Sequence, residues 1–205
     1  MTENTNPLNK YFRQPSIYVT LPSGTSYPPH VIQQSQSGEI GIQPMTAKDE
    51  IRFKTPDALM NGEGVVEVIQ SCVPQIKDAW QIRSYDLDTL LIAIRIATYG
   101  ETMDFTFTVP GANEQVTHSQ NLPAILDQIK STVIESEITL EDGLKISIRP
   151  LTYKDMTTAS QQTFQQQKMY SAVQDSELPD DDKAKRFNES FKALTELNTT
   201  ILLKN

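Results

Sequence analysis

The chain has 205 residues, of which 38% are hydrophobic and 21% charged, and its 26 acidic and 18 basic residues give a formal net charge of -8. A chain of this length can bury a sizeable core, so we expect one main domain with an appendage. The acidic balance argues against a nucleic-acid-binding protein, because affinity for phosphates depends on clustered Lys and Arg, and it favours protein partners instead.

Cysteine content and hydropathy indicate the cellular compartment in which the protein is expected. Cys72 is the only cysteine, so neither an intramolecular disulfide nor a cysteine-rich metal site can form. The longest apolar run, Leu90 to Ile94, is far shorter than the roughly 18 residues that a membrane-spanning helix needs. The polar N-terminus lacks the apolar stretch of a signal peptide. We therefore expect no membrane association and a protein made and used in a cytoplasm.

The N-terminal part of the chain predicts an arm followed by strands. Residues 1–15 are polar, which is typical of a flexible arm. Apolar and polar residues alternate in 16–22 and again in 38–44, so each stretch predicts a strand, and the Gly/Ser/Pro-rich segment 23–29 predicts a loop. We expect these strands to open an α+β body formed by residues 16–150.

The middle of the body contains the most apolar segment of the protein. A helix is expected after Thr46, with a break at 54–64 before helical sequence resumes. Residues 87–99 then carry apolar side chains around nearly the whole circumference of a helix, which is typical of a helix buried in the middle of a fold. Asp86 is expected to cap the N-terminus of this helix and Gly100 its C-terminus.

Two β-hairpins and a helical hairpin are predicted for the rest of the chain. The pattern of 103–118 predicts the first β-hairpin, a short helix follows, and 138–150 predicts the second. Residues 151–205 predict a long Gln-rich helix, an acidic loop and a final helix. The expected fold class is therefore α+β, with small mixed or antiparallel sheets around a buried central helix, followed by a C-terminal helical hairpin.

A nearly repeated phrase marks two of the expected helix starts. "IQPMTAKDE" begins at Ile42 and "IRPLTYKDM" at Ile148, each after a strand-like run and before helix-compatible sequence. In both copies a Thr precedes an Asp by three residues, the spacing of a capping box, in which each side chain bonds the backbone amide of the other residue. We interpret the phrase as two strand-to-helix corners rather than as a functional site. The capping pairs are Thr46 with Asp49, and Thr152 with Asp155.

Residues with catalytic or metal-binding chemistry are few and form no recognisable set. Asp86 and Asp88 could act as paired carboxylates, but they stand at a helix start, where unpaired amides favour Asp. His30 and His118 form no spaced ligand set with Cys72. We therefore expect no enzyme, no cofactor and no metal site, and we keep a soluble enzyme with an unrecognised carboxylate site as an alternative.

Association with other proteins is the remaining possibility. Tyr11, Phe12 and Tyr18 place aromatic side chains on an extended N-terminal segment, as a partner-binding arm would. In the final helix, six residues at alternating spacings of three and four form a seam. This seam packs either within the chain or against another chain, and the second arrangement would make a homo-oligomer. The seam residues are Ala184, Phe187, Phe191, Leu194, Asn198 and Ile201.

Four blocks of sequence resemble a known family of proteins. They read "YVTLPS", "GEIGIQPMTAKDE", "KTPDALMNGEGVVEVIQSCVP" and "DLDTLLIAIRIATYGE", and they lie in this order between Tyr18 and Glu101. Together they resemble the baseplate hub and hub-assembly proteins of T-even-like contractile-tailed bacteriophages. Because several separated blocks agree in order, the resemblance is more specific than one short motif.

The resemblance implies a non-enzymatic role in building the phage tail. Its expected partners are other baseplate hub proteins and, as a further possibility, the tape measure protein. The expected location is the virion tail baseplate, reached from the host cytoplasm during assembly. Two roles remain open within this class: a structural component of the hub, or a tail assembly chaperone for the tape measure or hub that is absent from the mature virion.

One feature of the resembling family has no counterpart in this chain. Many of the proteins that this chain resembles carry a Cys-x-x-Cys-like pair in the hairpin after the apolar helix. The pair looks like a small zinc knuckle. Here that hairpin reads "FTFTVPGANEQVTH" and contains no cysteine. A zinc site carried over from the family is therefore unsupported at these positions.

Overall fold

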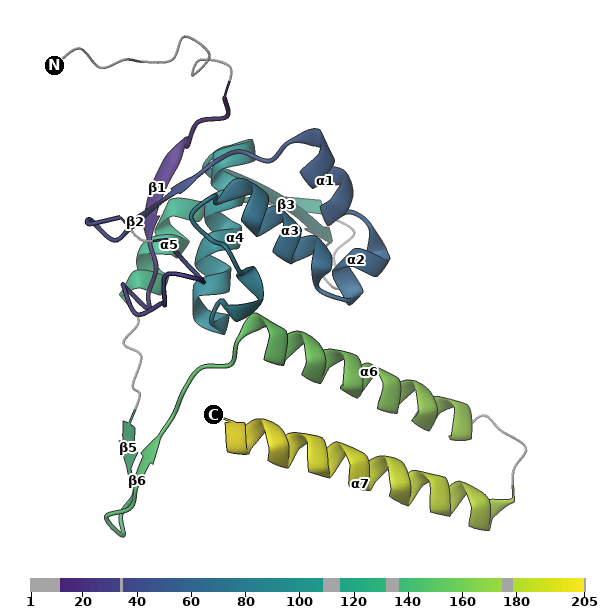
Figure 1. The fold of residues 1–205 in the computed structure, drawn as a ribbon. Helices are drawn as coiled ribbons and strands as arrows, with labels where there is room; N and C mark the ends of the chain where they lie inside the picture. The colour runs from purple at the N-terminus through teal and green to yellow at the C-terminus, as the bar shows by residue number, and fades with distance from the viewer. Residues whose placement is uncertain (1–11, 34, 109–114, 132–136, 175–178, 205) are drawn as a thin grey trace, which may run out of the picture.

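The computed structural model describes residues 12–33, 35–108, 115–131, 137–174 and 179–204. Helices and short strands form a body, and a pair of long helices extends from it (Figure 1). The predicted α+β class is confirmed, and the described part of the chain contains three two-stranded antiparallel sheets.

The body begins with a strand pair and continues as helices. Strands β1 (Ile17–Thr20) and β2 (Glu39–Ile42) pair antiparallel, with Val19 opposite Ile40. The elements that follow are α1 (Ala47–Phe53), α2 (Pro56–Met60), α3 (Glu63–Cys72), the 3-10 helix η2 (Ala79–Gln81) and α4 (Ser84–Tyr99). Helix α2 lies within the stretch where a break was expected, because Pro56 occupies its first turn, where a missing amide hydrogen costs nothing.

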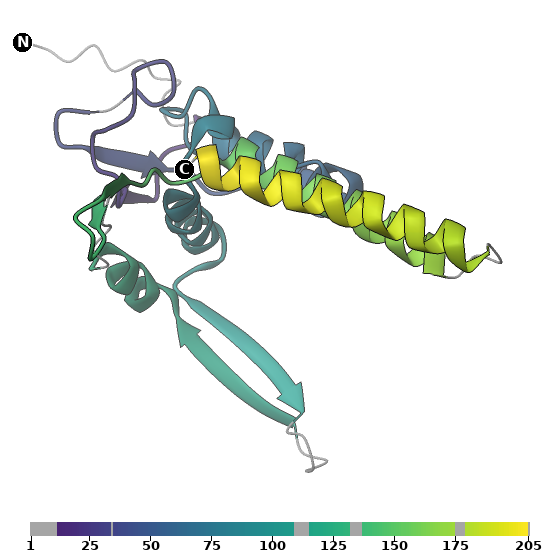
Figure 2. The ribbon, with the colours of Figure 1, turned by 90° about the horizontal axis from the view of Figure 1, so that it is seen from below.

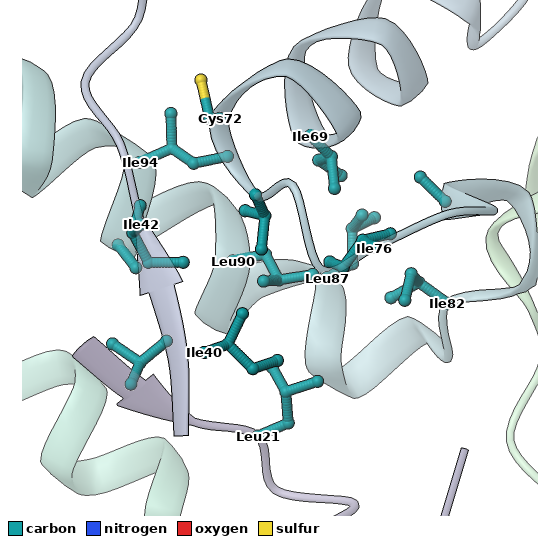
Figure 3. Packing of buried hydrophobic residues seen from close by; sticks show 14 of the residues in the cluster. Leu21, Ile40, Ile42, Ile69, Cys72, Ile76, Ile82, Leu87, Leu90 and Ile94 are labelled. Atoms are coloured by element: carbon teal, nitrogen blue, oxygen red, sulfur yellow. The ribbon is translucent and has the colours of Figure 1, made fainter. Parts of the chain in front are cut away.

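The apolar helix α4 lies in the middle of the body, as its sequence predicts. Leu90 and Ala93 are fully buried, and side chains from β2, α3 and the segment after α3 pack around the helix (Figure 3). These surrounding side chains include Ile40, Ile42, Ile69, Cys72, Ile76 and Ile82. All of these surrounding side chains come from elements that precede α4 in the sequence.

Two β-hairpins follow the core. Strands β3 (Thr102–Thr108) and β4 (Gln115–Asn121) form a hairpin that projects away from the body (Figure 2). Helix α5 (Leu122–Lys130) returns to the body, where Leu122 and Leu126 are buried. Strands β5 (Glu137–Thr139) and β6 (Lys145–Ser147) form the second hairpin, with Gly143 in its turn at φ +84°, a value that favours glycine. Residues 109–114, which connect β3 to β4, lie outside the described residues.

The chain ends in a helical hairpin made of α6 (Tyr153–Gln174) and α7 (Asp180–Lys204). The two helices lie side by side and run in opposite directions, and both views show them extending beyond the body (Figures 1 and 2). None of the helices in the described parts of the chain has the length and apolar character to cross a bilayer.

A compact joint fixes the start of α6 on the body. Ser84 N donates to Leu151 O at 2.9 Å, and Tyr153 N donates to Ile82 O at 2.7 Å. The rings of Trp80 and Tyr153 are stacked, with centroids 5.6 Å apart. These contacts set the position from which the helical hairpin extends.

Candidate interaction surfaces

The N-terminal segment is held to the body by Arg13. Its guanidinium donates to Ser71 Oγ at 3.1 Å and to Cys72 Sγ at 3.2 Å, and lies 3.5 Å from Asp49 Oδ2. Gln43 Nε2 donates in turn to Arg13 O at 3.1 Å. The sequence offered no local indication of this anchor, since Arg13 and Cys72 are 59 residues apart.

The predicted aromatic arm starts just before this anchor. Phe12 and Tyr18 are both exposed, at 60% and 63%, and Tyr11 lies outside the described residues. Strand β1, which carries Tyr18, pairs with β2 on one side, and no other strand of the described chain pairs with it. An open strand edge next to exposed aromatic side chains can accept an added strand.

The first copy of the repeated phrase forms a complete capping box. Thr46 N donates to Asp49 Oδ2 at 2.8 Å, and Asp49 N donates to Thr46 Oγ1 at 3.3 Å. Burial alone would raise the pKa of Asp49, but hydrogen bonds from the backbone and hydroxyl of Thr46 outweigh it and lower that pKa. Met45 N also donates to Thr98 Oγ1 at 2.9 Å, which ties this corner to α4.

The second copy makes the same contacts in a different setting. Thr152 Oγ1 donates to Asp155 Oδ2 at 2.8 Å, and Asp155 N donates to Thr152 Oγ1 at 3.2 Å. Thr152 forms an isolated antiparallel bridge with Arg83, directly before α4. This corner therefore joins the helical hairpin to the body.

The expected cap of the apolar helix is wrong in detail. Helix α4 begins at Ser84, so Asp86 lies in its first turn, and no side chain caps the helix. Asp86 is fully buried instead, and its carboxylate accepts from Tyr27 OH at 2.6 Å and from Ser23 N at 3.0 Å. Burial and the adjacent Asp86 carboxylate raise the pKa of Tyr27. This carboxylate binds the 23–29 loop to the core.

Other residues with potential chemistry lie apart. Asp88, His30 and His118 are exposed on separate elements, and burial raises the pKa of the Cys72 thiol to about 11. Arg95 lies over the ring of Tyr99, 4.5 Å from its centroid. Within the described ranges, no three His, Cys, Asp or Glu side chains are grouped to hold a metal ion.

The seam of the last helix divides between two environments. Ser190, which is not a seam residue, is buried against α6, and Leu194 is half-buried beside it. Phe187 and Phe191 are 45% and 64% exposed, and their rings stack with centroids 6.5 Å apart. A cavity of about 430 Å³ opens between the helices. It is lined by Thr163, Gln166, Gln167, Phe187, Ser190, Phe191 and Leu194.

The β5–β6 hairpin carries an apolar face that sequence reasoning missed. Ile138 lies opposite Ile146 in the register, and strand alternation places the neighbouring even-numbered residues on the same face. The exposed aliphatic residues of this face are Ile138, Leu140, Leu144, Ile146 and Ile148. The alternation was visible in the sequence, but it did not reveal that the β5–β6 hairpin would lie away from the rest of the body (Figure 1).

The projecting β3–β4 hairpin also exposes apolar side chains. Phe105 and Phe107 are exposed, and Phe107 lies opposite the exposed Val116. The hydroxyls of Thr106 and Thr117 lie 3.2 Å apart on the other face. The body thus presents three extensions with uncovered apolar side chains: two β-hairpins and one helical hairpin.

Comparison with known proteins identifies one family. A family model described as "T4 bacteriophage base plate protein" matches residues 15–202, which is more than nine-tenths of the chain. The curated proteins and the solved structures contain no match.

Proposed function

Because the chain belongs to the family of T4 bacteriophage base plate proteins, we propose that this baseplate protein works in the hub as a non-enzymatic component whose role is ordered association with neighbouring subunits. The family places it in the phage tail baseplate among other tail proteins. The hub and the identities of its neighbours are part of the proposal.

The observation that carries the proposal is the set of apolar extensions on a well-packed body. An isolated two-stranded hairpin is marginally stable in water, and exposed aliphatic faces of this kind mark protein contacts. The β5–β6 hairpin has five exposed aliphatic residues on one face and polar residues such as Lys145 and Ser147 on the other. A neighbouring subunit that covers this face would complete a small core.

The N-terminal aromatic residues support association in the same way. Phe12 and Tyr18 are exposed beside the open edge of β1, while Arg13 fixes the segment to the body. A strand from a neighbouring subunit could pair with this edge and cover Tyr18. Contact at this edge and at the β5–β6 face would fix the protein between two neighbours.

Complementation of a phage that lacks the gene tests the proposal. Ile146→Asp places a charge on the apolar face of β6, and Ser147→Asp places the same charge on the opposite face. We expect Ile146→Asp to abolish incorporation into baseplates while Ser147→Asp retains it, as measured by electron microscopy and mass spectrometry of purified assemblies. Equal incorporation of both variants would contradict a contact through this face.

A tail assembly chaperone is the alternative within the same family. Mass spectrometry of purified virions separates the two roles, since a structural hub component remains in the mature tail and a chaperone does not. Absence from virions, together with presence in assembly intermediates, would replace the structural role by the chaperone role. Circular dichroism of Ile146→Asp and Ser147→Asp excludes unfolding as the cause of lost incorporation into baseplates.

A further inference from the structure

Helix α7 carries an uncharged stripe that α6 covers only in part. At 3.6 residues per turn, Ala184, Phe187, Phe191, Thr195 and Asn198 lie on one side of the helix, and all five are exposed. The charged residues of the same segment lie away from this stripe, and they are Lys185, Arg186, Glu189, Lys192 and Glu196. The helix is therefore amphipathic, but its uncharged side faces outward beside the cavity between α6 and α7.

Two buried polar atoms indicate that this surface is incomplete in the single chain. Ser190 is only 4% exposed, and its Oγ has no hydrogen-bond partner. Gln166 Oε1 is also buried without one, and both side chains line the cavity of about 430 Å³. A buried polar atom without a partner costs about 1–3 kcal/mol. A molecule that seats itself on the groove with hydrogen-bonding groups would remove this cost.

The distribution of charge indicates a second copy of the same chain. Residues 1–150 hold 11 basic and 18 acidic residues, whereas residues 151–205 hold 7 basic and 8 acidic residues. The electrostatic repulsion between two copies is thus concentrated in the body, and the helical hairpin is nearly neutral. The segment of α6 from Met156 to Gln167 contains no charged residue. A two-fold interface must be self-complementary, and Ser and Gln side chains both donate and accept.

We propose that two copies associate through α6 and α7 to form an antiparallel four-helix bundle. A face about 33 Å long, from 22 residues of helix, and roughly 20 Å wide, from two adjacent helices, gives about 650 Å² per copy. The total of about 1,300 Å² lies within the range of stable interfaces. In the antiparallel arrangement the acidic bodies lie at opposite ends, farther apart than the screening length of about 8 Å at physiological salt. This inference does not depend on the hub assignment.

Sedimentation velocity of the full chain over a micromolar concentration series tests the bundle. We expect a monomer–dimer equilibrium that Phe191→Asp shifts strongly towards monomer. A central aromatic contributes about 30-fold to affinity, and a two-fold interface contains the substitution twice, so the Kd should rise by about 1,000-fold. Phe107→Asp makes the same change at a similarly exposed position on β3 and should leave the Kd unchanged.

Further outcomes decide against the bundle. A monomer at every concentration, or a dimer that Phe191→Asp leaves intact, overturns it. Dissociation by high salt also overturns it, because the proposed contacts are uncharged. If the chain is monomeric and Phe191→Asp still prevents incorporation into baseplates, a different protein covers the groove, and the proposed function stands without the dimer. Unchanged helix content in circular dichroism confirms that the variants are folded.

Discussion

The body and the helical hairpin contain helices of opposite character: α4 is mostly apolar, whereas α6 and α7 are mostly polar. In α4 the residues Leu87, Leu90, Ala93 and Ile94 are buried in the core, whereas in α6 and α7 the only buried residue among those described is Ser190. The helices of the body bury a core within the single chain, whereas the large apolar side chains Phe164, Phe187 and Phe191 of the helical hairpin are exposed. The difference indicates that the body supplies folding stability and that the hairpin supplies surface for association.

The repeated phrase shows this difference at two helix starts with the same capping chemistry. Thr46 opens α1, which packs against α3 inside the body, and Thr152 opens α6, which leaves the body after its first turns. The capping box determines where a helix begins. The residues that follow determine whether it is buried.

The largest expected effect on the free energy of unfolding comes from comparing the same substitution, Leu to Ala, in the body and in the helical hairpin. Leu90 is 0% exposed, so Leu90→Ala should lower the free energy of unfolding by about 4 kcal/mol, because it removes buried methyl groups and leaves a cavity. Leu203 is 84% exposed, so Leu203→Ala should change it by less than about 0.5 kcal/mol. Urea unfolding followed by circular dichroism measures both. Similar losses would show that the end of α7 is buried in solution.

The contrast between local and distant contacts explains what the sequence could and could not predict. The strands, the two β-hairpins and the Thr–Asp pairs depend on residues a few positions apart, so their spacing was informative. The partners of Asp86 lie far from it in the sequence: Tyr27 is 59 residues away, and a Gly/Ser/Pro-rich loop that contains a tyrosine gives no indication of this contact. The seam of α7 was visible as a spacing, but the spacing could not determine which side would face α6.

A second, smaller effect tests whether Asp86 holds the body together rather than serving chemistry. Asp86→Ala leaves Tyr27 OH and Ser23 N without their acceptor, so we expect the free energy of unfolding to fall by about 3 kcal/mol. Asp88 is exposed on the same helix, and Asp88→Ala should change it by less than about 0.5 kcal/mol. Urea denaturation of the three proteins measures this difference. An undiminished stability of the Asp86 variant would refute the structural role.

The joint between body and hairpin should respond to a single added methyl group. Gly62 has φ +81°, and a Cβ there would lie 2.9 Å from Thr157 Cγ2 and 3.1 Å from Trp80. The left-handed backbone costs about 1–2 kcal/mol for an alanine, and the contacts should bring the total loss of unfolding free energy for Gly62→Ala to about 2 kcal/mol. Gly24 has φ +61°, and a Cβ there would have nothing within 4 Å, so Gly24→Ala measures the cost of the left-handed backbone alone. Equal losses would mean that α6 moves aside freely.

The smallest expected effects come from removing each of the two capping boxes. The two substitutions should lower the free energy of unfolding equally, but they should differ in their effect on fluorescence. Thr46→Ala and Thr152→Ala should each lower the free energy of unfolding by about 1 kcal/mol. Only Thr152 adjoins Tyr153, which stacks on Trp80, the sole tryptophan, so only Thr152→Ala should alter the native fluorescence. A fluorescence change in the Thr46 variant would show that the corners are coupled through the body.

The first box also has a pH dependence that follows from the lowered pKa of Asp49. The folded state binds the Asp49 proton less tightly than the unfolded chain, whose Asp titrates near 3.9. The stabilisation by Asp49 is therefore fully present above that value and is lost as the pH falls through the lower pKa of the folded state. The difference in unfolding free energy between the wild type and Asp49→Asn should shrink towards zero in acid. A difference that stays constant into acid would mean that Asp49 stabilises α1 by shape and neutral hydrogen bonds, without a contribution from its charge.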